Sequence, residues 1–381
     1  LELELPKEDT IEAILVSTVK DLDYDSQPNS EDEREIISAS KGLSIMEAEW
    51  TYRKIIAEKN RITKNEINLI IKEKEQIIKK SGVLEYFHPQ GDFNEVGGME
   101  NLKDWLGKRG KAFSNDAKEF GLVSPKGVML LGIPGCGKSL VSKTIANEWE
   151  LPLLKLDLGS VFGSLVGESE ARMREALSLA EAISPSILWI DEIEKGLSGI
   201  TNGGDGGTSA KVFGTLLTWM QEKKNEVFVI STANDISALP PELLRKGRFD
   251  EIFFVDLPSA QEREDIFKIH IEKKKREIGN FDFNELRNKS VGFSGAEIEE
   301  AVNEALFIAY DSNKELDIKH IEEALEKTFP LSRTMESTIK DLRSWAKVRA
   351  RFASNGKSEE LPESKECIPT LPQEKSNPFI N

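Results

Sequence analysis

The segment Gly132-Ile133-Pro134-Gly135-Cys136-Gly137-Lys138-Ser139 decides the fold class of this chain of 381 residues. It has the spacing G-x-x-x-x-G-K-S, follows the apolar run 128–131 and opens a helical pattern. Glycines at these positions let backbone N–H groups converge on a phosphate at the N-terminus of a helix. We therefore expect a phosphate-binding loop in which Lys138 reaches the β- and γ-phosphates and the Ser139 hydroxyl holds Mg²⁺.

Short β-rich runs alternate with helical windows on both sides of this loop. The predicted strands are Gly127–Leu131, Leu153–Asp157, Ser186–Ile190, Val227–Ser231 and Glu251–Val255, and the helical windows include Ser139–Glu150 and Glu170–Ile183. This alternation is typical of an α/β fold, with a parallel sheet covered by helices on both faces. Ligands of such sheets bind at the carboxyl ends of the strands.

Polar side chains follow two of these strands. Asp191 and Glu192 end the apolar run 187–190, where Asp191 is expected to bind Mg²⁺ through water and Glu192 to polarise an attacking water. Such carboxylates often cap the next helix, but the phosphate loop favours a catalytic role. After the next strand, the amide of Asn234 is placed to hydrogen-bond the attacking water or the γ-phosphate. An Asn in that place is otherwise usually a turn residue.

Two arginines, Arg245 and Arg248, lie three residues apart ahead of the last predicted strand. Arginine is the residue type that stabilises charge on a transferring phosphoryl group in trans. As isolated residues they would belong to a solvated face. We therefore expect them to act on the phosphates of a neighbouring subunit.

An internal sequence repeat indicates two related modules. The segment 3–6 (L-E-L-P) is similar to 255–258 (V-D-L-P), and 42–47 (G-L-S-I-M-E) is similar to 292–297 (G-F-S-G-A-E), followed by another amphipathic helix in each copy. Matched segments in one register favour a duplication whose first copy is cut off at the start of the chain. The alternative is two unrelated helical bundles that share a helix-start pattern, Ser followed by Glu three residues later.

Composition narrows the function classes. Hydrophobic residues make up 39% of the chain and charged residues 31%, which permits a packed core. The formal net charge of −16 argues against a nucleic-acid coat or an anionic-membrane binder. The two cysteines fit a reducing compartment, and the apolar runs are too short to span a bilayer. The first residue is Leu and no signal-peptide pattern follows, so we expect a fragment.

Over about residues 92–335, the motifs resemble those of the AAA+ ATPases. The phosphate loop, I-L-W-I-D-E (187–192), S-T-A-N-D (231–235) and L-P-P-E-L-L-R-K-G-R-F-D (239–250) resemble that superfamily's two Walker motifs, first sensor and second region of homology. The resemblance implies ATP and Mg²⁺ as cofactors. It also implies that the two arginines are fingers acting on a neighbour's ATP, so that the active unit is a ring, commonly a hexamer.

Two further segments resemble the AAA proper branch: 93–99 (F-N-E-V-G-G-M), which packs on adenine there, and the lid motif 292–297. His270 stands where that branch places a histidine that contacts ribose or adenine; a surface histidine is the alternative. The implied catalytic residues are Lys138, Asp191, Glu192, Asn234, Arg245 and Arg248, with Ser139 and Asp191 on the metal. The implied nucleotide-binding residues are Val96, Gly97, Gly132, Ile133, Pro134, Gly135, Cys136, Gly137, Lys138, Ser139, Leu140, His270, Gly295 and Ala296.

The sequences of three segments resemble those of one family within AAA+, hypothetical chloroplast open reading frame forty-six. The segments are 101–106, 151–170 and 243–258. That family occurs in cyanobacteria and red-algal plastids, which implies the cyanobacterial cytoplasm or the plastid stroma, and it has a degenerate first ATPase module. The expected organisation is the last strand and lid of that module at 1–88, a nucleotide-binding domain at 92–258, a helical lid at 259–335, a C-terminal helix at 336–353 and a flexible tail at 354–381.

Two segments leave the function open. Leu165 stands where many AAA unfoldases present an aromatic residue to the central pore, which weakens the case for strong threading. The amphipathic window 339–352 is expected to pack on its own domain, with docking to a partner or a membrane surface as the alternative.

Three hypotheses follow: an ATP-hydrolysing ring that remodels a protein client, an ATP-gated scaffold with slow hydrolysis, and a nucleic-acid motor. The motor is the least favoured, because it rests only on the superfamily's breadth and on the basic run 273–276. The client of a remodelling ring is not identified by the sequence.

Overall fold

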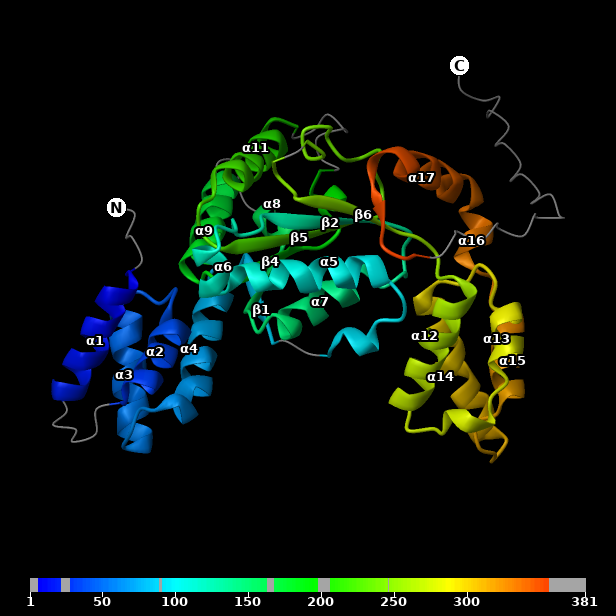
Figure 1. Cartoon of the computed structure of the whole chain (residues 1–381), viewed down its shortest axis with the longest axis horizontal. Helices are drawn as coiled ribbons and strands as arrows, with labels where there is room; N and C mark the ends of the chain where they lie inside the picture. Colours follow the sequence, from blue (N-terminus) through cyan, green and yellow to red (C-terminus); the bar gives the residue numbers. More distant parts are fainter. Residues whose placement is uncertain are drawn as a thin grey trace, which may run out of the picture. The chain divides into compact units, whose positions relative to one another are not determined.

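The computed structural model describes residues 6–21, 28–88, 91–162, 168–197, 206–245 and 247–355. They form two compact units. The first runs to Asp256 and resumes at Leu342, and the second is Leu257–Asp341. Figure 1 shows the strands of the first unit side by side in one sheet, and the second unit as a helical bundle.

The first unit contains a seven-stranded sheet in the order β1-β3-β4-β5-β2-β6-β7. All neighbouring strands are parallel except β1 and β3, which are antiparallel. The bounds are Leu84–Phe87 (β1), Gly127–Gly132 (β2), Leu153–Leu156 (β3), Ser186–Ile190 (β4), Val227–Ala233 (β5), Glu251–Val255 (β6) and Arg351–Phe352 (β7). The predicted α/β fold is confirmed, and its five predicted strands are found with ends within two residues of those expected.

The two edge strands lie where the sequence did not predict them. β1 falls in the segment 1–88, which we assigned to the first module, yet it pairs with β3 through Leu84 and Leu156. The sheet therefore takes in residues ahead of the expected domain start at 92. β7 lies in the segment 336–353, which we expected to be helical throughout, and it pairs with β6.

Helices cover both faces of the sheet. Phe228 of β5 contacts the ring of Trp105 on one face, whereas its neighbour Val229 belongs to a buried cluster with Met173 and Leu216. Successive strand residues point to opposite faces, so these partners lie on opposite sides of the sheet. The helices of this domain are α5 (Glu100–Gly110), α6 (Asn115–Glu119), α7 (Lys138–Glu148), α8 (Leu158–Phe162), α9 (Glu168–Ala182) and α11 (Gly206–Glu222), with short 3₁₀ segments η2 (Phe93–Glu95), η3 (Lys111–Phe113) and η4 (Ile193–Leu197).

Two helical bundles share a run of four α-helices, with a 3₁₀ segment after the third helix in one and after the first helix in the other. The first has α1 (Glu8–Asp21), α2 (Ser30–Ser40), α3 (Ile45–Lys59), η1 (Lys64–Glu66) and α4 (Ile67–Lys80); the second has α12 (Ala260–Lys273), η5 (Ile278–Asn280), α13 (Phe283–Lys289), α14 (Gly295–Asp311) and α15 (Ile318–Lys327), followed by α16 (Leu331–Thr334). A capping box opens the third helix of each, with Ser44 and Glu47 in one and Ser294 and Glu297 in the other. The strand expected at 3–6 in the first copy lies mostly outside the described residues.

A buried serine occupies the same place in both bundles. Ser40 donates to the carbonyl of Ile36 at 2.7 Å, and Ser290 donates to that of Leu286 at 2.6 Å. The serine oxygen then accepts a hydrogen bond from the Tyr52 hydroxyl in the first bundle and from Arg263 in the second. The repeat therefore keeps the buried hydroxyl while its partner has changed.

The C-terminal helix α17 (Glu336–Arg349) packs on its own domain, as expected. Leu342 and Ala346 are buried with Phe254 of β6. The polar segment 28–33 contains the start of a helix. α2 begins inside it at Ser30, because the Asn29 side chain accepts hydrogen bonds from the amides of Glu31 and Asp32. The tail expected at 354–381 lies outside the described residues from 356 onward.

Candidate active site

The phosphate loop connects β2 to α7 and needs its glycines. Gly132, Gly135 and Gly137 have φ angles of 155°, 75° and 87°, a region that favours glycine. A Cβ on Gly132 would lie 2.0 Å from the carbonyl oxygen of Val255 on β6. The neighbouring strand thus fixes the residue type at the start of the loop.

Lys138 is the first residue of α7 and is only 6% exposed. Its ammonium donates to the carbonyls of Gly132 at 2.9 Å and Ile133 at 2.7 Å, so it is folded back onto the loop. Burial lowers the pKa of Lys138 to about 8, although nearby acidic groups oppose this shift. A bound phosphate would supply the negative charge that this buried ammonium lacks.

Ser139 and Asp191 meet at the carboxyl ends of β2 and β4. The Ser139 hydroxyl donates to Oδ1 of Asp191 at 2.9 Å, and the Thr232 hydroxyl donates to the same oxygen at 2.6 Å. Hydroxyl and carboxylate oxygens are hard donors of the kind that Mg²⁺ accepts together with water and substrate phosphates. The two residues therefore fit the predicted metal site. No cluster of three or more His, Cys, Asp or Glu ligands occurs in the parts of the chain that the structure describes.

Both carboxylate oxygens of Glu192 have a partner. The Asn234 amide donates to Oε1 at 2.9 Å, and the Lys195 ammonium pairs with Oε2. Its backbone has a φ of 48°, which is unusual for a non-glycine residue. The expected base and the expected sensor amide are thus in direct contact.

A third carboxylate, Glu194, belongs to the site although the sequence analysis did not select it. It is 8% exposed, and its Oε1 accepts the backbone N–H of Asn234 at 2.9 Å. Its Oε2 is buried and has no hydrogen-bond partner among the described residues. Burial raises the pKa of Glu194. The sequence feature that could have identified Glu194 is its position three residues after Asp191.

The segment expected to pack on adenine also approaches the loop. Val96 follows η2 and is 3% exposed, and a Cβ on Gly137 would lie 3.1 Å from Cε of Met99. Cys136 is buried in the loop, which fits a small structural residue. Contacts of Val96, Gly97, Cys136 and Leu140 with a nucleotide stay predictions.

The two arginines are not part of this cluster. Arg245 is exposed, and Arg248 donates to the carbonyl of Glu242 in its own loop. Within the described ranges, neither forms a hydrogen bond or an ion pair with the phosphate loop, Asp191 or Glu192. That arrangement is compatible with the expected action in trans.

The expected lid residues belong to the second unit. His270 lies on α12, where burial lowers its pKa while Glu299, 3.7 Å away, opposes this shift. Gly295 and Ala296 open α14, behind the Ser294 cap. Their contact with a nucleotide stays a prediction. Leu165, expected at the pore, lies outside the described residues, as does most of the glycine-rich stretch 199–207.

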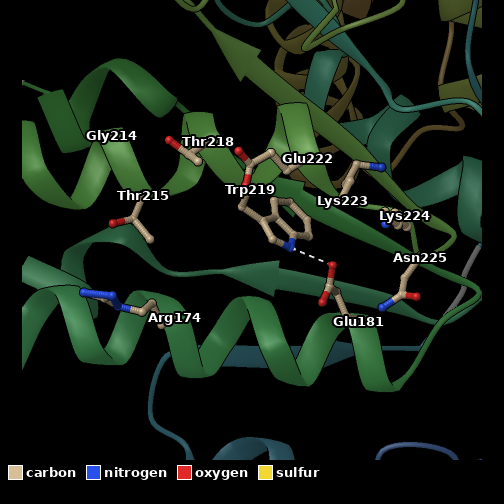
Figure 2. Close-up of a pocket in the computed structure, with 10 residues that line it drawn as sticks. All are labelled: Arg174, Glu181, Gly214, Thr215, Thr218, Trp219, Glu222, Lys223, Lys224 and Asn225. Atoms are coloured by element: carbon tan, nitrogen blue, oxygen red, sulfur yellow. Dashed lines mark hydrogen bonds between the residues drawn. The ribbon is translucent and has the colours of Figure 1, made fainter.

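A separate cavity of about 770 Å³ opens between α9 and α11. Figure 2 shows Trp219 within it, its Nε1 donating to Oε1 of Glu181 at 3.0 Å. Its lining is Arg174, Glu181, Gly214, Thr215, Thr218, Trp219, Glu222, Lys223, Lys224 and Asn225. None of these is a predicted nucleotide-binding residue, so the cavity is distinct from the site.

Comparison of the sequence with known proteins identifies the family of this chain. The ATPase family associated with various cellular activities (AAA) matches residues 128–257. The AAA domain-containing protein ycf46 of Guillardia theta is 46% identical over 93% of this chain and 70% of its own length. That of Pyropia yezoensis is 49% identical over 86% of this chain and 67% of its own. The chain belongs to this family of AAA proteins. The resemblance found in the sequence is therefore confirmed.

Other matches are narrower. The second domain of SpoVK-like AAA ATPases matches residues 9–81, which cover the first helical bundle. An ATP-dependent zinc metalloprotease FtsH of Karelsulcia muelleri is 35% identical over 62% of this chain and 39% of its own length. No helix among the described residues has the length and apolarity needed to cross a membrane.

Proposed function

We propose that this AAA protein binds ATP with Mg²⁺ and hydrolyses it to ADP and phosphate. The observation that carries the proposal is the meeting of four groups at adjacent strand ends. Ser139 contacts Asp191 at 2.9 Å, and Asn234 contacts Glu192 at 2.9 Å. A metal site beside a carboxylate and an amide is the arrangement that phosphoryl transfer to water requires.

Each side chain has a proposed role. The backbone amides of the loop and Lys138 hold the phosphates. Ser139 and Asp191 would hold Mg²⁺, which would supply positive charge to neutralise the phosphates. Glu192 accepts a proton from the attacking water, and Asn234 orients that water or the γ-phosphate. Val96, Gly97, His270, Gly295 and Ala296 contact the nucleoside.

Catalysis is proposed to require a second copy of the chain. Arg245 and Arg248 form no hydrogen bond or ion pair with the site within the described ranges, and both lie on one loop after β5. Guanidinium groups that stabilise the transferring phosphoryl group would therefore come from a neighbour. The proposed assembly is a homo-oligomeric ring, commonly a hexamer in AAA proteins, that remodels a protein client.

Steady-state phosphate release tests the proposal. Glu192→Gln is expected to reduce turnover by orders of magnitude, and Arg248→Ala by roughly 10³–10⁵-fold. Arg276→Ala is the matched control, because Arg276 pairs with Glu315 on the surface of the second unit. Wild-type turnover in both Glu192→Gln and Arg248→Ala would contradict the mechanism.

A second candidate is an ATP-gated scaffold with slow hydrolysis. One observation favours it: both carboxylate oxygens of Glu192 are engaged, by Asn234 and by Lys195. An attacking water therefore has to share this carboxylate with two donors that already hold it, on the one lone pair that remains at each oxygen. Tight ring assembly with a non-hydrolysable nucleotide, together with negligible turnover, would favour the scaffold; a monomer in both conditions would exclude it.

We also infer that the first bundle, 1–88 apart from β1, is the lid of a degenerate AAA-like module. The SpoVK-like match over residues 9–81 and the repeated capping boxes support this. Among the described residues, the nucleotide site is then the one at the phosphate loop after β2. The algal relatives support the plastid stroma as the location, and the family resemblance implies the cyanobacterial cytoplasm as the alternative.

A further inference from the structure

Thr232 lies at the centre of the catalytic groups, yet it has no role in the function proposed above. It is the sixth residue of β5 and is 1% exposed. Ile190 of β4 is opposite Ser231, so Thr232 is level with the residue that follows Ile190, which is Asp191. The sheet register therefore brings Thr232 beside the metal-binding carboxylate.

The hydrogen bonds of the Thr232 hydroxyl have a fixed direction. Its oxygen lies 2.8 Å from the backbone nitrogen of Glu192, and a backbone N–H can only donate. The hydroxyl therefore accepts that bond, and its single hydrogen is directed to Oδ1 of Asp191, 2.6 Å away. One side chain thus links the metal-binding residue to the backbone of the base.

This link acts on two residues that need positioning. Asp191 receives a second hydroxyl from Ser139 on the same oxygen, which fixes the direction of its carboxylate. Glu192 has a φ of 48°, a backbone conformation that is unfavourable for residues with a side chain. Its N–H bond to Thr232 holds that conformation, while Asn234 holds the end of its side chain.

Threonine is suited to this role. Two heavy substituents on Cβ restrict χ1, so the hydroxyl of a buried threonine in a strand keeps one direction. Valine has the same shape and would fill the same space without either hydrogen bond. A side chain that served only for packing would tolerate that exchange.

We propose that Thr232 is a positioning residue for ATP hydrolysis, which sets the Asp191 carboxylate and the Glu192 backbone through one hydroxyl. The inference rests on the proposed function for its effect on turnover. Its structural part, the anchoring of the Glu192 amide, is measurable without any hydrolysis.

The experiment compares Thr232→Val, Thr232→Ser and Ser231→Ala in the full chain. Ser231 is the matched control, since it is buried in the same strand and its hydroxyl has no hydrogen-bond partner among the described residues. Three quantities are measured: kcat and KM for ATP, binding of a fluorescent ADP analogue in EDTA, and amide exchange of the segment that contains Glu192.

Loss of such a supporting hydrogen bond typically lowers activity by about 10–100-fold. We expect that loss in kcat for Thr232→Val, with ADP-analogue affinity in EDTA within about twofold of wild type, since the phosphate loop is untouched. Thr232→Ser should recover kcat to within about threefold, because the hydroxyl returns. The Glu192 amide should exchange at least about tenfold faster in Thr232→Val only.

Wild-type kcat and wild-type amide exchange in Thr232→Val would overturn the proposal. Equal losses of kcat in the Val and Ser variants would also do so, since they would indicate packing. If the wild-type chain itself does not hydrolyse ATP, the proposed function fails, and the amide exchange alone decides whether Thr232 anchors Glu192.

Discussion

Arg343 of α17 and Asp256 form a bidentate ion pair, in which Nε lies 3.0 Å from both carboxylate oxygens. The two side chains are only 13% and 10% exposed. Asp256 is the last residue of the first unit before the chain enters the second, and Leu342 is the first residue after its return. The ion pair therefore joins the segment that leaves the first unit to the segment that returns to it, and both residues belong to that unit.

Removal of this pair should destabilise the sheet domain. Arg343→Ala leaves Asp256 as a nearly buried charge without its main partner, and breaking such a pair costs roughly 3 kcal/mol. Urea unfolding measures the change. Lys340→Ala is the control on the same helix, where Lys340 is 66% exposed and pairs with Glu336. Its loss should change the free energy of unfolding by less than about 0.5 kcal/mol, and equal effects of the two variants would contradict the prediction.

Two glycines should respond to alanine in opposite ways. Gly132→Ala places a Cβ 2.0 Å from a backbone oxygen that cannot move aside, so the phosphate loop should lose nucleotide binding. Gly214 lies inside α11, and a Cβ there would meet no described atom within 4 Å. Gly214→Ala should raise the free energy of unfolding by roughly 0.5–1 kcal/mol. Calorimetry of ADP binding and urea unfolding check the pair; unimpaired binding by Gly132→Ala would contradict the account.

The first bundle should become more stable as pH rises. Lys74 of α4 is buried, with its ammonium 3.1 Å from the carbonyl of Ala39, and burial lowers its pKa to about 7. Above that pKa the folded bundle releases a proton that the unfolded chain keeps until about pH 10.4. The free energy of unfolding therefore rises between about pH 7 and about pH 10.4, by an amount on the order of a few kcal/mol. Below about pH 7, this lysine contributes no pH dependence.

Lys74→Met should remove this rise, since no proton is then released on folding. Lys72→Met, at an exposed position of the same helix, is the control and should keep the pH dependence of the wild type. For both variants, the free energy of unfolding of the first bundle is measured by urea titration at about four evenly spaced pH values between pH 6 and pH 10. A slope that persists in Lys74→Met would show that another group causes it.

The central strands could be predicted because they are continuous apolar runs. Every position of β4 and β5 is buried, which is the composition of a strand with helices on both faces. The edge strand β1 (L-E-Y-F) has only four residues and one fully buried position, so nothing in the sequence separated it from a turn. β7 has two residues and depends entirely on β6 for its definition.

The residues of the site that belong to a sequence motif could be predicted. Those whose role depends on the register between neighbouring strands could not. Asp191, Glu192 and Asn234 follow strands in a recognisable pattern, and the structure brings them together with Ser139. Thr232 was not selected, since its role arises from the alignment of β4 with β5 and from a hydrogen bond to a backbone amide. Only the paired strands contain that information.

The most direct test of the central claim mixes two inactive variants, Glu192→Gln and Arg248→Ala, and measures phosphate release. In a ring whose arginines act in trans, an Arg248→Ala protomer with an intact base can receive the arginine of a Glu192→Gln neighbour. An equal mixture should therefore regain about one quarter of wild-type turnover, although each variant alone stays inactive. A mixture as inactive as its components would contradict the shared site.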